Sequence, residues 1–329
     1  MMHPDVPIHA WRQRGAALLT AMLMVVLVAT LASSMLWQQW RGVEVESAQR
    51  TRMQAAWVLT GALDWARLIL REDARQGGAD HLAEPWAVPL EPARLSTFLA
   101  AEQGQANIDD DGAEQAFLAG QIEDQQARLN VTNLVDGKKL HAPSVAAWQR
   151  LFEHLSLPQD ELTAFTQALL QSQSVAADQR DRPPGQPLQP RRVADLAWLG
   201  LSAQTLQVLQ PYITLLPERT SVNLNTAPAE VLLAAVPGME LAQARALVQA
   251  RTRQHMGALA DADTLVGNAA IRFDTTAHGV ASRFFSVRGQ LRLGDATLQE
   301  VSLLQRDGLD VKVLLRQREL LTPLTPTLQ

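Results

Sequence analysis

The uncharged run near the N-terminus constrains this 329-residue chain more than any other feature. No charged residue occurs from Ala16 to Trp40. Built as a helix, Ala16–Trp37 would be roughly 33 Å long, which matches the apolar core of a bilayer. Trp37 and Trp40 close the run, where aromatic side chains commonly lie at a membrane interface. The run therefore predicts a transmembrane helix over residues 16–40.

The residues before this run predict its orientation and processing. Arg12 and Arg14 place the N-terminus in the cytoplasm and send the bulk of the chain across the membrane. A basic leader that ends in Gly15, directly before Ala16, resembles the leader of type IV prepilins, which is cut after the glycine. Residues 1–15 are then the leader. A secretory signal cut near Ala32–Ser34 is the alternative, but the apolar run is longer than such signals usually carry.

The helix is expected to continue well beyond the membrane. No proline occurs from Ala16 to Arg75, and Leu59, Leu63 and Ala66 recur at helical spacing. Residues 16–75 would form one helix roughly 90 Å long. Its second half, residues 41–75, would lay an apolar stripe on a soluble domain.

Composition excludes several classes of protein for the rest of the chain. With 47% hydrophobic and 19% charged residues it is globular rather than disordered. The absence of cysteine rules out a disulfide scaffold, a zinc ribbon and a thiol nucleophile. A net charge of −5 disfavours nucleic-acid binding, which depends on clustered basic residues.

Helical and extended patterns divide the remaining chain. Asp109–Gly112 reads as the turn of a hairpin whose second strand is Phe117–Glu123, and Asp181–Arg192 as a linker. Phe284–Glu319 alternates as a three-stranded meander with one buried face, turning at Gly294-Asp295 and Asp307-Gly308. Between them the chain reads helical, best in Ser144–Leu155, Gln159–Ser172, Val193–Leu199, Ser202–Leu209, Pro228–Val236 and Leu241–Arg253.

These patterns predict an α+β fold. A pilin-like long N-terminal helix would pack on a small antiparallel sheet formed by residues 76–128 and 280–320. A large all-α insertion over 129–279 would interrupt the sheet, because strands occur on both sides of the helical block. Residues 321–329 would be a flexible tail.

The segment Ser221–Met239 contains the most recognisable motif of the helical block. Thr226 is a suitable N-cap, Pro228 would lie in the first helical turn, and Pro237-Gly238 would turn the chain into a second helix. The motif resembles the helix-hairpin-helix of competence-type DNA receptors, although Glu240 replaces a glycine that would face phosphate. A structural scaffold is favoured, and a membrane-anchored DNA receptor is the alternative. The scaffold residues are Asn223, Asn225, Thr226, Pro228, Pro237 and Gly238, and Val222, Leu224, Val231, Leu232 and Val236 should be core.

The sequence offers no catalytic constellation. Motifs such as HExxH, GxSxG, Walker A and the dinucleotide fingerprint do not occur. The adjacent carboxylates Glu123-Asp124, and Asp261 with Asp263, are expected to be solvated, and Asp109–Asp111 to form a turn rather than a calcium loop. The chain is therefore not expected to be an enzyme.

Several stretches together resemble one family over nearly the whole chain, the K-class minor pseudopilins of bacterial type II secretion. They are RQRGAALL, LREDARQGG, DHLAEPWAVPL, QIEDQQARLNVTNLV, SVNLNTAPAEVLLAAVPG and RFFSVRGQLRLGDATLQEVSLLQR. The resemblance implies a subunit of the inner membrane, with a periplasmic bulk, at the tip of the pseudopilus. There it would help to start the fibre and to export folded proteins across the outer membrane. Implied partners are the I- and J-class minor pseudopilins, other pseudopilins, the inner-membrane assembly platform and a prepilin peptidase, with no nucleic acid.

Two features depart from common patterns of the pilin class. Most pilins carry glutamate at mature position five, where it neutralises the N-terminal amine of the subunit above. Here that position is Thr20, which suits a tip subunit and also suits a hydroxyl that bonds its own helix. Family members that bind calcium carry an acidic loop in the insertion, whereas Gln171 and Gln173 stand at the corresponding places here. We therefore expect no metal and no other cofactor.

Overall fold

The computed structural model describes residues 14–95, 116–173, 187–268, 270–293 and 296–321. The chain divides into two units, Met1–Trp57 and Val58–Gln329. The predicted turn at Asp109–Gly112, the turn at Gly294-Asp295 and nearly all of the tail lie outside the described residues, as do most of the leader and half of the linker. Those parts stay predictions.

One helix dominates the N-terminal part of the chain. The helix α1 runs from Arg14 to Gln76, as the absence of proline predicted. Within the first unit, every described side chain from Ala17 to Arg50 is exposed, apolar ones included. Among the described residues, α1 is a helix that is both long enough and apolar enough to span a membrane.

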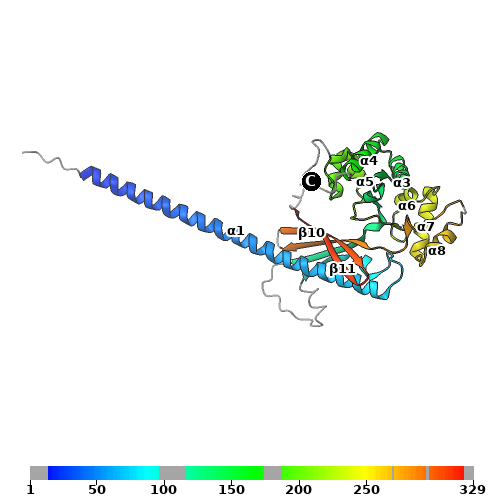
Figure 1. Cartoon of the computed structure of the whole chain (residues 1–329). Coiled ribbons are helices and arrows are strands. Elements are labelled where there is room, and N and C mark those ends of the chain that lie inside the picture. The colour runs from blue at the N-terminus through cyan, green and yellow to red at the C-terminus, as the bar shows by residue number, and fades with distance from the viewer. Residues whose placement is uncertain (1–13, 96–115, 174–186, 269, 294–295, 322–329) are drawn as a thin grey trace, which may run out of the picture. The chain divides into compact units, whose positions relative to one another are not determined.

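The second unit is built around a five-stranded sheet with the order β1-β2-β9-β10-β11. All neighbouring strands are antiparallel, so the meander of the last three strands is confirmed. The sheet joins β2 to β9, which confirms that everything between them is an insertion into one sheet (Figure 1). The strands are β1 (Leu90–Arg94), β2 (Ala116–Asp124), β9 (Phe284–Leu293), β10 (Ala296–Asp307) and β11 (Asp310–Leu321).

The C-terminal part of α1 packs on one face of this sheet. Leu63, Ala66 and Leu70 are buried there against alternate residues of the strands, such as Phe285 and Leu304. The period-2 alternation of β9 places its apolar side chains on this face, because successive residues of a strand point to opposite sides. The ring of Trp86 meets Phe285 edge-on, with centroids 5.2 Å apart, and closes the core.

The insertion is a helical unit with a core of its own. Its large buried side chains include Trp148, Phe152 and Phe165, with the rings of Trp148 and Phe165 5.7 Å apart. In Figure 1 its helices are coloured green to yellow. They are α3 (Ala142–His154), α4 (Gln159–Gln173), α5 (Ala203–Leu209), α6 (Ala229–Ala235), α7 (Leu241–Arg253) and α8 (Leu259–Val266).

The prediction of an all-α insertion is wrong in detail. Short strands pair within it, two of the pairs parallel, and four 3-10 helices occur among the described residues of the second unit. The strands are β3 (Leu129–Asn130) with β6 (Ile213–Thr214), β4 (Val135–Asp136) with β5 (Lys139–Leu140), and β7 (Val222–Asn223) with β8 (His278–Gly279). The 3-10 helices are η1 (Pro85–Ala87), η2 (Gln125–Ala127), η3 (Val131–Leu134) and η5 (Val193–Leu199).

Two elements differ from their predicted form for identifiable reasons. The segment Val193–Leu199 is a 3-10 helix, since the Asp195 carboxylate binds the backbone N–H groups of Arg191 and Arg192 at its start and Gly200, at φ 101°, ends it. The predicted single buried face of β11 is also wrong. A bulge opposite Leu303 and Leu304 reverses its alternation, so Arg316 lies on the face that packs against α1 and hydrogen-bonds Thr60 at 2.7 Å.

Candidate functional site

The residues predicted to act in the membrane lie on the first unit. Gly15 and Ala16 lie in the first turn of α1, while Trp37 and Trp40 are exposed farther along the same helix. The Thr20 hydroxyl donates to the carbonyl of Ala17 at 2.9 Å, as expected of a hydroxyl that bonds its own helix. Processing after Gly15 and interfacial roles for the two tryptophans stay predictions.

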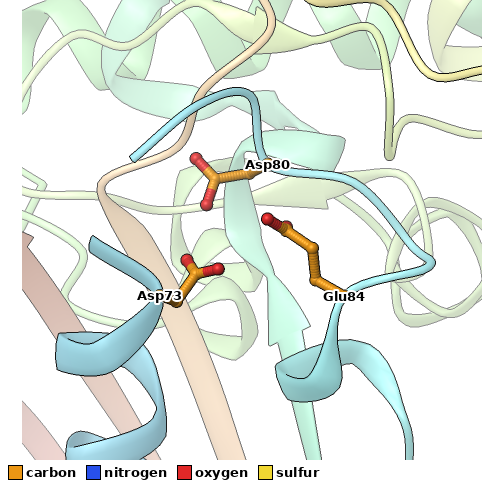
Figure 2. A group of neighbouring side chains, drawn as sticks. All are labelled: Asp73, Asp80 and Glu84. Carbon is orange, nitrogen blue, oxygen red and sulfur yellow. The ribbon is translucent and has the colours of Figure 1, made fainter. Parts of the chain in front are cut away.

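Three carboxylates converge at the point where α1 ends. Asp73 lies in the last turns of the helix, Asp80 in the loop that follows, and Glu84 just before η1, and Figure 2 shows the three groups facing one another. The guanidinium of Arg306 from β10 bridges Asp73 and Asp80, at 2.5 Å from Asp80. Sequence reasoning missed this cluster, because Asp73 and Arg306 are 233 residues apart.

Burial sets the protonation of this cluster. The pKa of Asp80 is raised above its ordinary value, chiefly by burial, although Arg306 and the backbone N–H of Ser282 act in the opposite direction. The pKa of Asp73 is also raised by burial first and by the nearby Glu84 charge second. Both raised pKa values mean that the surroundings disfavour the ionised form of these two carboxyl groups.

The donor set is of the kind that Ca²⁺ or Mg²⁺ prefers, but its oxygens already have partners. Both oxygens of Asp80 are occupied, one by Arg306 and the other by the backbone N–H of Ser282 at 2.6 Å. Glu84 accepts from the N–H of His81 at 2.8 Å and from the indole of Trp86 at 2.7 Å. The Arg306 guanidinium thus supplies the positive charge that Asp73 and Asp80 face.

A second polar centre lies at Asp124, where β2 leaves the sheet. This side chain is only 5% exposed, so the prediction that Glu123-Asp124 would be solvated is wrong for Asp124. Its neighbour Glu123 pairs with Arg128 at 2.8 Å and is partly exposed. Successive strand residues point to opposite faces, so one of two adjacent carboxylates had to turn inward.

Asp124 binds donors from the sheet and from the insertion. It accepts from the Asn223 amide at 3.0 Å, from the hydroxyls of Thr226 and Ser282 at 2.6 Å each, and from the backbone N–H of Gln126 at 2.7 Å. The Asn223 amide also donates to the carbonyl of Asp80 at 3.2 Å. Asp124 and the acidic cluster therefore form one network, which fixes the insertion to the sheet.

The predicted hairpin scaffold has this network at its base. Asn223 is buried in β7, and the Asn225 amide donates to the carbonyl of Met256 at 2.9 Å. The prediction that Thr226 is an N-cap is wrong: its hydroxyl is bound to Asp124, and α6 begins one residue after Pro228, which is its N-cap. Gly238 adopts φ 77°, the left-handed conformation that the turn after Pro237 requires. The predicted core residues Val222, Leu224, Val231, Leu232 and Val236 are confirmed as buried.

The helix α7, which is the second helix of the hairpin, is poorly suited to bind a nucleic acid. Arg251 is buried, and its guanidinium donates to the carbonyl of Leu224 at 2.6 Å. Burial lowers its pKa to about 10, so it stays charged, but the charge is used inside the protein. Glu240 at the start of α7 adds a negative charge where a phosphate would have to approach.

Comparisons with known proteins show what the chain is similar to. Two family models described as type II secretion system, protein K, match residues 127–218 and 222–281. The type II secretion system protein K of Pseudomonas aeruginosa is 29% identical over 94% of this chain and 93% of its own length. The chain is thus similar to type II secretion system protein K over nearly its whole length. The protein K of Klebsiella pneumoniae is also 29% identical, over 90% of this chain and 94% of that protein.

A solved structure supports the fold of this chain. It is the crystal structure of the GspK-GspI-GspJ complex from enterotoxigenic Escherichia coli, with a TM-score of 0.61 and 21% identity. The match covers 83% of this chain and 98% of the matched chain. The predicted α+β pilin-like architecture is confirmed. The chain is a minor pseudopilin of type II secretion, and a DNA receptor is not favoured.

Proposed function

We propose that this minor pseudopilin occupies the tip of the pseudopilus, in a complex with one I-class and one J-class subunit. The observation that carries the proposal is the protein K likeness along nearly the whole chain. The related chain in the Escherichia coli structure is in a complex of GspK, GspI and GspJ. In this role the chain is a structural subunit, without an enzymatic reaction of its own.

The bulk of the insertion supports a position at the end of the fibre. Residues 125–283 separate β2 from β9 and form a body with its own core. Pilin subunits repeat closely along a fibre, so a subunit with this extra body fits best where nothing is stacked above it. Thr20 agrees, because a subunit with no neighbour above needs no carboxylate in the membrane to neutralise an amine.

The proposed location is the bacterial inner membrane, with a cytoplasmic N-terminus and a periplasmic second unit. The apolar helix α1 supports anchoring, and the arginines at positions 12 and 14 support the orientation. We further propose cleavage by a prepilin peptidase after Gly15, with the helix retained. Intact mass and N-terminal sequencing of membrane-extracted protein test this: a native N-terminus at Ala16 is expected, and one at Met1 or near Ser33 would contradict it.

Binding of I- and J-class subunits tests the tip role directly. Full-length chain, co-expressed with both subunits in a secreting host, should be recovered from solubilised membranes together with them. Deleting its gene should abolish secretion and reduce the number of pseudopili. Normal secretion in the deletion strain, or recovery of the chain without either subunit, would contradict the proposal.

A further inference from the structure

An apolar groove opens beside the C-terminal part of α1. It has a volume of about 250 Å³ and lies between α1, the segment Pro85–Leu90 and the strands β2 and β9. Its mouth is formed by apolar side chains from both walls, and Trp65 and Val88 among them are exposed to solvent. Exposed apolar surface of this kind, next to charged residues, marks a place where another molecule binds.

A pair of glycines creates the floor of the groove. Gly120 in β2 and Gly289 in β9 face each other across the sheet, so no side chain rises between the strands and the helix at this point. A Cβ at Gly289 would lie 3.1 Å from a methyl group of Leu59, whereas one at Gly120 would meet only the Arg288 carbonyl at 3.6 Å. The space above Gly120 can therefore receive a group from outside.

One buried polar group at the groove, the Ser302 hydroxyl, has no partner among the described residues. The Ser302 side chain lines the groove and is only 1% exposed. A buried hydroxyl without a partner is costly, so an occupant that brings an oxygen acceptor would stabilise it.

The charge around the groove is positive. Glu300 also lines it, but this carboxylate binds both Arg316 and Arg318, at 2.6 Å in the case of Arg318. Arg288 contributes its backbone carbonyl to the lining, because its side chain points to the other face of β9. The two guanidinium groups of Arg316 and Arg318 against one carboxylate favour an occupant that carries a negative charge.

We propose that this groove receives an apolar side chain, with a carboxylate next to it, from a subunit of the I–J pair. The proposal rests on the proposed function and names the surface that serves it. A cavity of about 150 Å³ holds one benzene molecule, so this groove has room for a large aliphatic or aromatic side chain. An anchor side chain in such a pocket commonly dominates the affinity of an interface.

Thiol protection in membranes tests the site, because the chain has no cysteine of its own. Gly120→Cys is compared with Gly257→Cys, whose Cβ would lie on the exposed surface of the insertion. A small maleimide should label Gly120→Cys in membranes that hold the full chain alone, and at least tenfold more slowly when I and J are co-expressed. The rate at Gly257→Cys should not change.

Equal labelling of Gly120→Cys with and without I and J would overturn the proposal. So would an absence of labelling in both membranes. A third outcome is that Gly120→Cys is protected from the maleimide in membranes without I and J, and that this protection disappears when lipid is removed. The occupant would then be an anionic amphiphile, and this outcome also rejects the proposal.

Filling the groove provides a second test. Gly120→Val should reduce the I and J recovered with the full chain at least tenfold, without lowering the midpoint of thermal unfolding, and Gly257→Val should not. If wild-type chain recovers neither subunit, the proposed function fails. If wild type and all variants recover both equally, the groove assignment fails and the proposed function stands.

Discussion

Asp124 gathers donors from several parts of the chain around one buried carboxylate. Its partners lie in η2, in the strand β7, in the turn before α6 and in the segment that leads into β9. We expect Asp124→Ala to lower the free energy of unfolding by about 3 kcal/mol, because four donors would lose their acceptor in the interior. Thermal unfolding of the full chain, followed by circular dichroism, measures the loss. Glu123→Ala is the control and should cost less than about 1 kcal/mol, because its ion pair is partly exposed.

The pH dependence of Asp124 follows from its surroundings. Burial, the largest effect, raises its pKa above the ordinary 3.8, while its hydrogen bonds act in the opposite direction. The folded chain therefore binds this proton more tightly than the unfolded chain, and folding loses stability as pH rises from the ordinary pKa through the raised one. The stability of wild type relative to Asp124→Asn, which cannot titrate, should fall from pH 4 toward neutral pH. A relative stability that rises over this range would contradict the assigned direction.

Arg306 serves as the internal cation of the cluster formed by Asp73, Asp80 and Glu84. Arg306→Ala should lower the free energy of unfolding by about 3–5 kcal/mol at neutral pH, because the buried carboxylates lose their counter-charge. The variant should recover stability on addition of millimolar Ca²⁺, for which three carboxylates are suitable ligands, whereas wild type should not respond. Melting curves with Ca²⁺ and with a chelator decide this. Arg283→Ala, which breaks half-exposed ion pairs, is the control and should be nearly neutral.

Among the elements, α6 depends on a single apolar face that is fully buried. Leu232 has no exposed surface and packs in the core of the insertion. We expect Leu232→Ala to destabilise the insertion by about 2–5 kcal/mol, through lost contacts and the cavity left behind. Leu265→Ala, at a half-exposed position of α8, should cost far less. Equal effects in chemical denaturation would show that α6 is not held by this core.

The elements that the sequence predicted well share a strong period or a clear boundary. The helix α1 has no proline and a regular apolar stripe, and apolar residues or glycine alternate with polar residues in β9 from Phe285 to Leu293. The two-residue strands β3 and β6 pair in parallel across about 80 residues and are too short to show a period. The helix α8 was missed because its eight residues carry few buried side chains.

The hydrogen-bond network around Asp124, which joins the insertion to the sheet (the junction network), could be predicted only in part. The asparagines and the threonine of the hairpin were recognised as scaffold residues, and all three are buried. Their partner Asp124 was assigned to solvent, since sequence spacing does not reveal which distant donors a strand end will meet. The same holds for Arg306, whose partners come from the far end of α1 and the loop after it.

For the whole molecule, the bulk of the insertion and the threonine at position 20 both fit a subunit that occurs once per fibre. The insertion enlarges the second unit between β2 and β9, and the junction network holds it to the sheet. A filament whose subunits repeat closely cannot accept this bulk at every step. Replacing Thr20 with glutamate should therefore be neutral or poorly tolerated, and never required for assembly, as fibre counts and secretion assays would show.

Overproduction tests the same idea at the scale of the fibre. If each copy starts or ends a pseudopilus without extending it, raising the amount of this subunit should create more and shorter fibres. Electron microscopy of sheared pseudopili measures their length distribution, with overproduction of the major pseudopilin as the control, which should lengthen them. Labelling of this subunit at regular intervals along fibres, or cross-linking between copies of it, would place it in the shaft. That outcome would reject the tip position and leave the likeness to protein K intact, because the likeness rests on sequence and the position on packing.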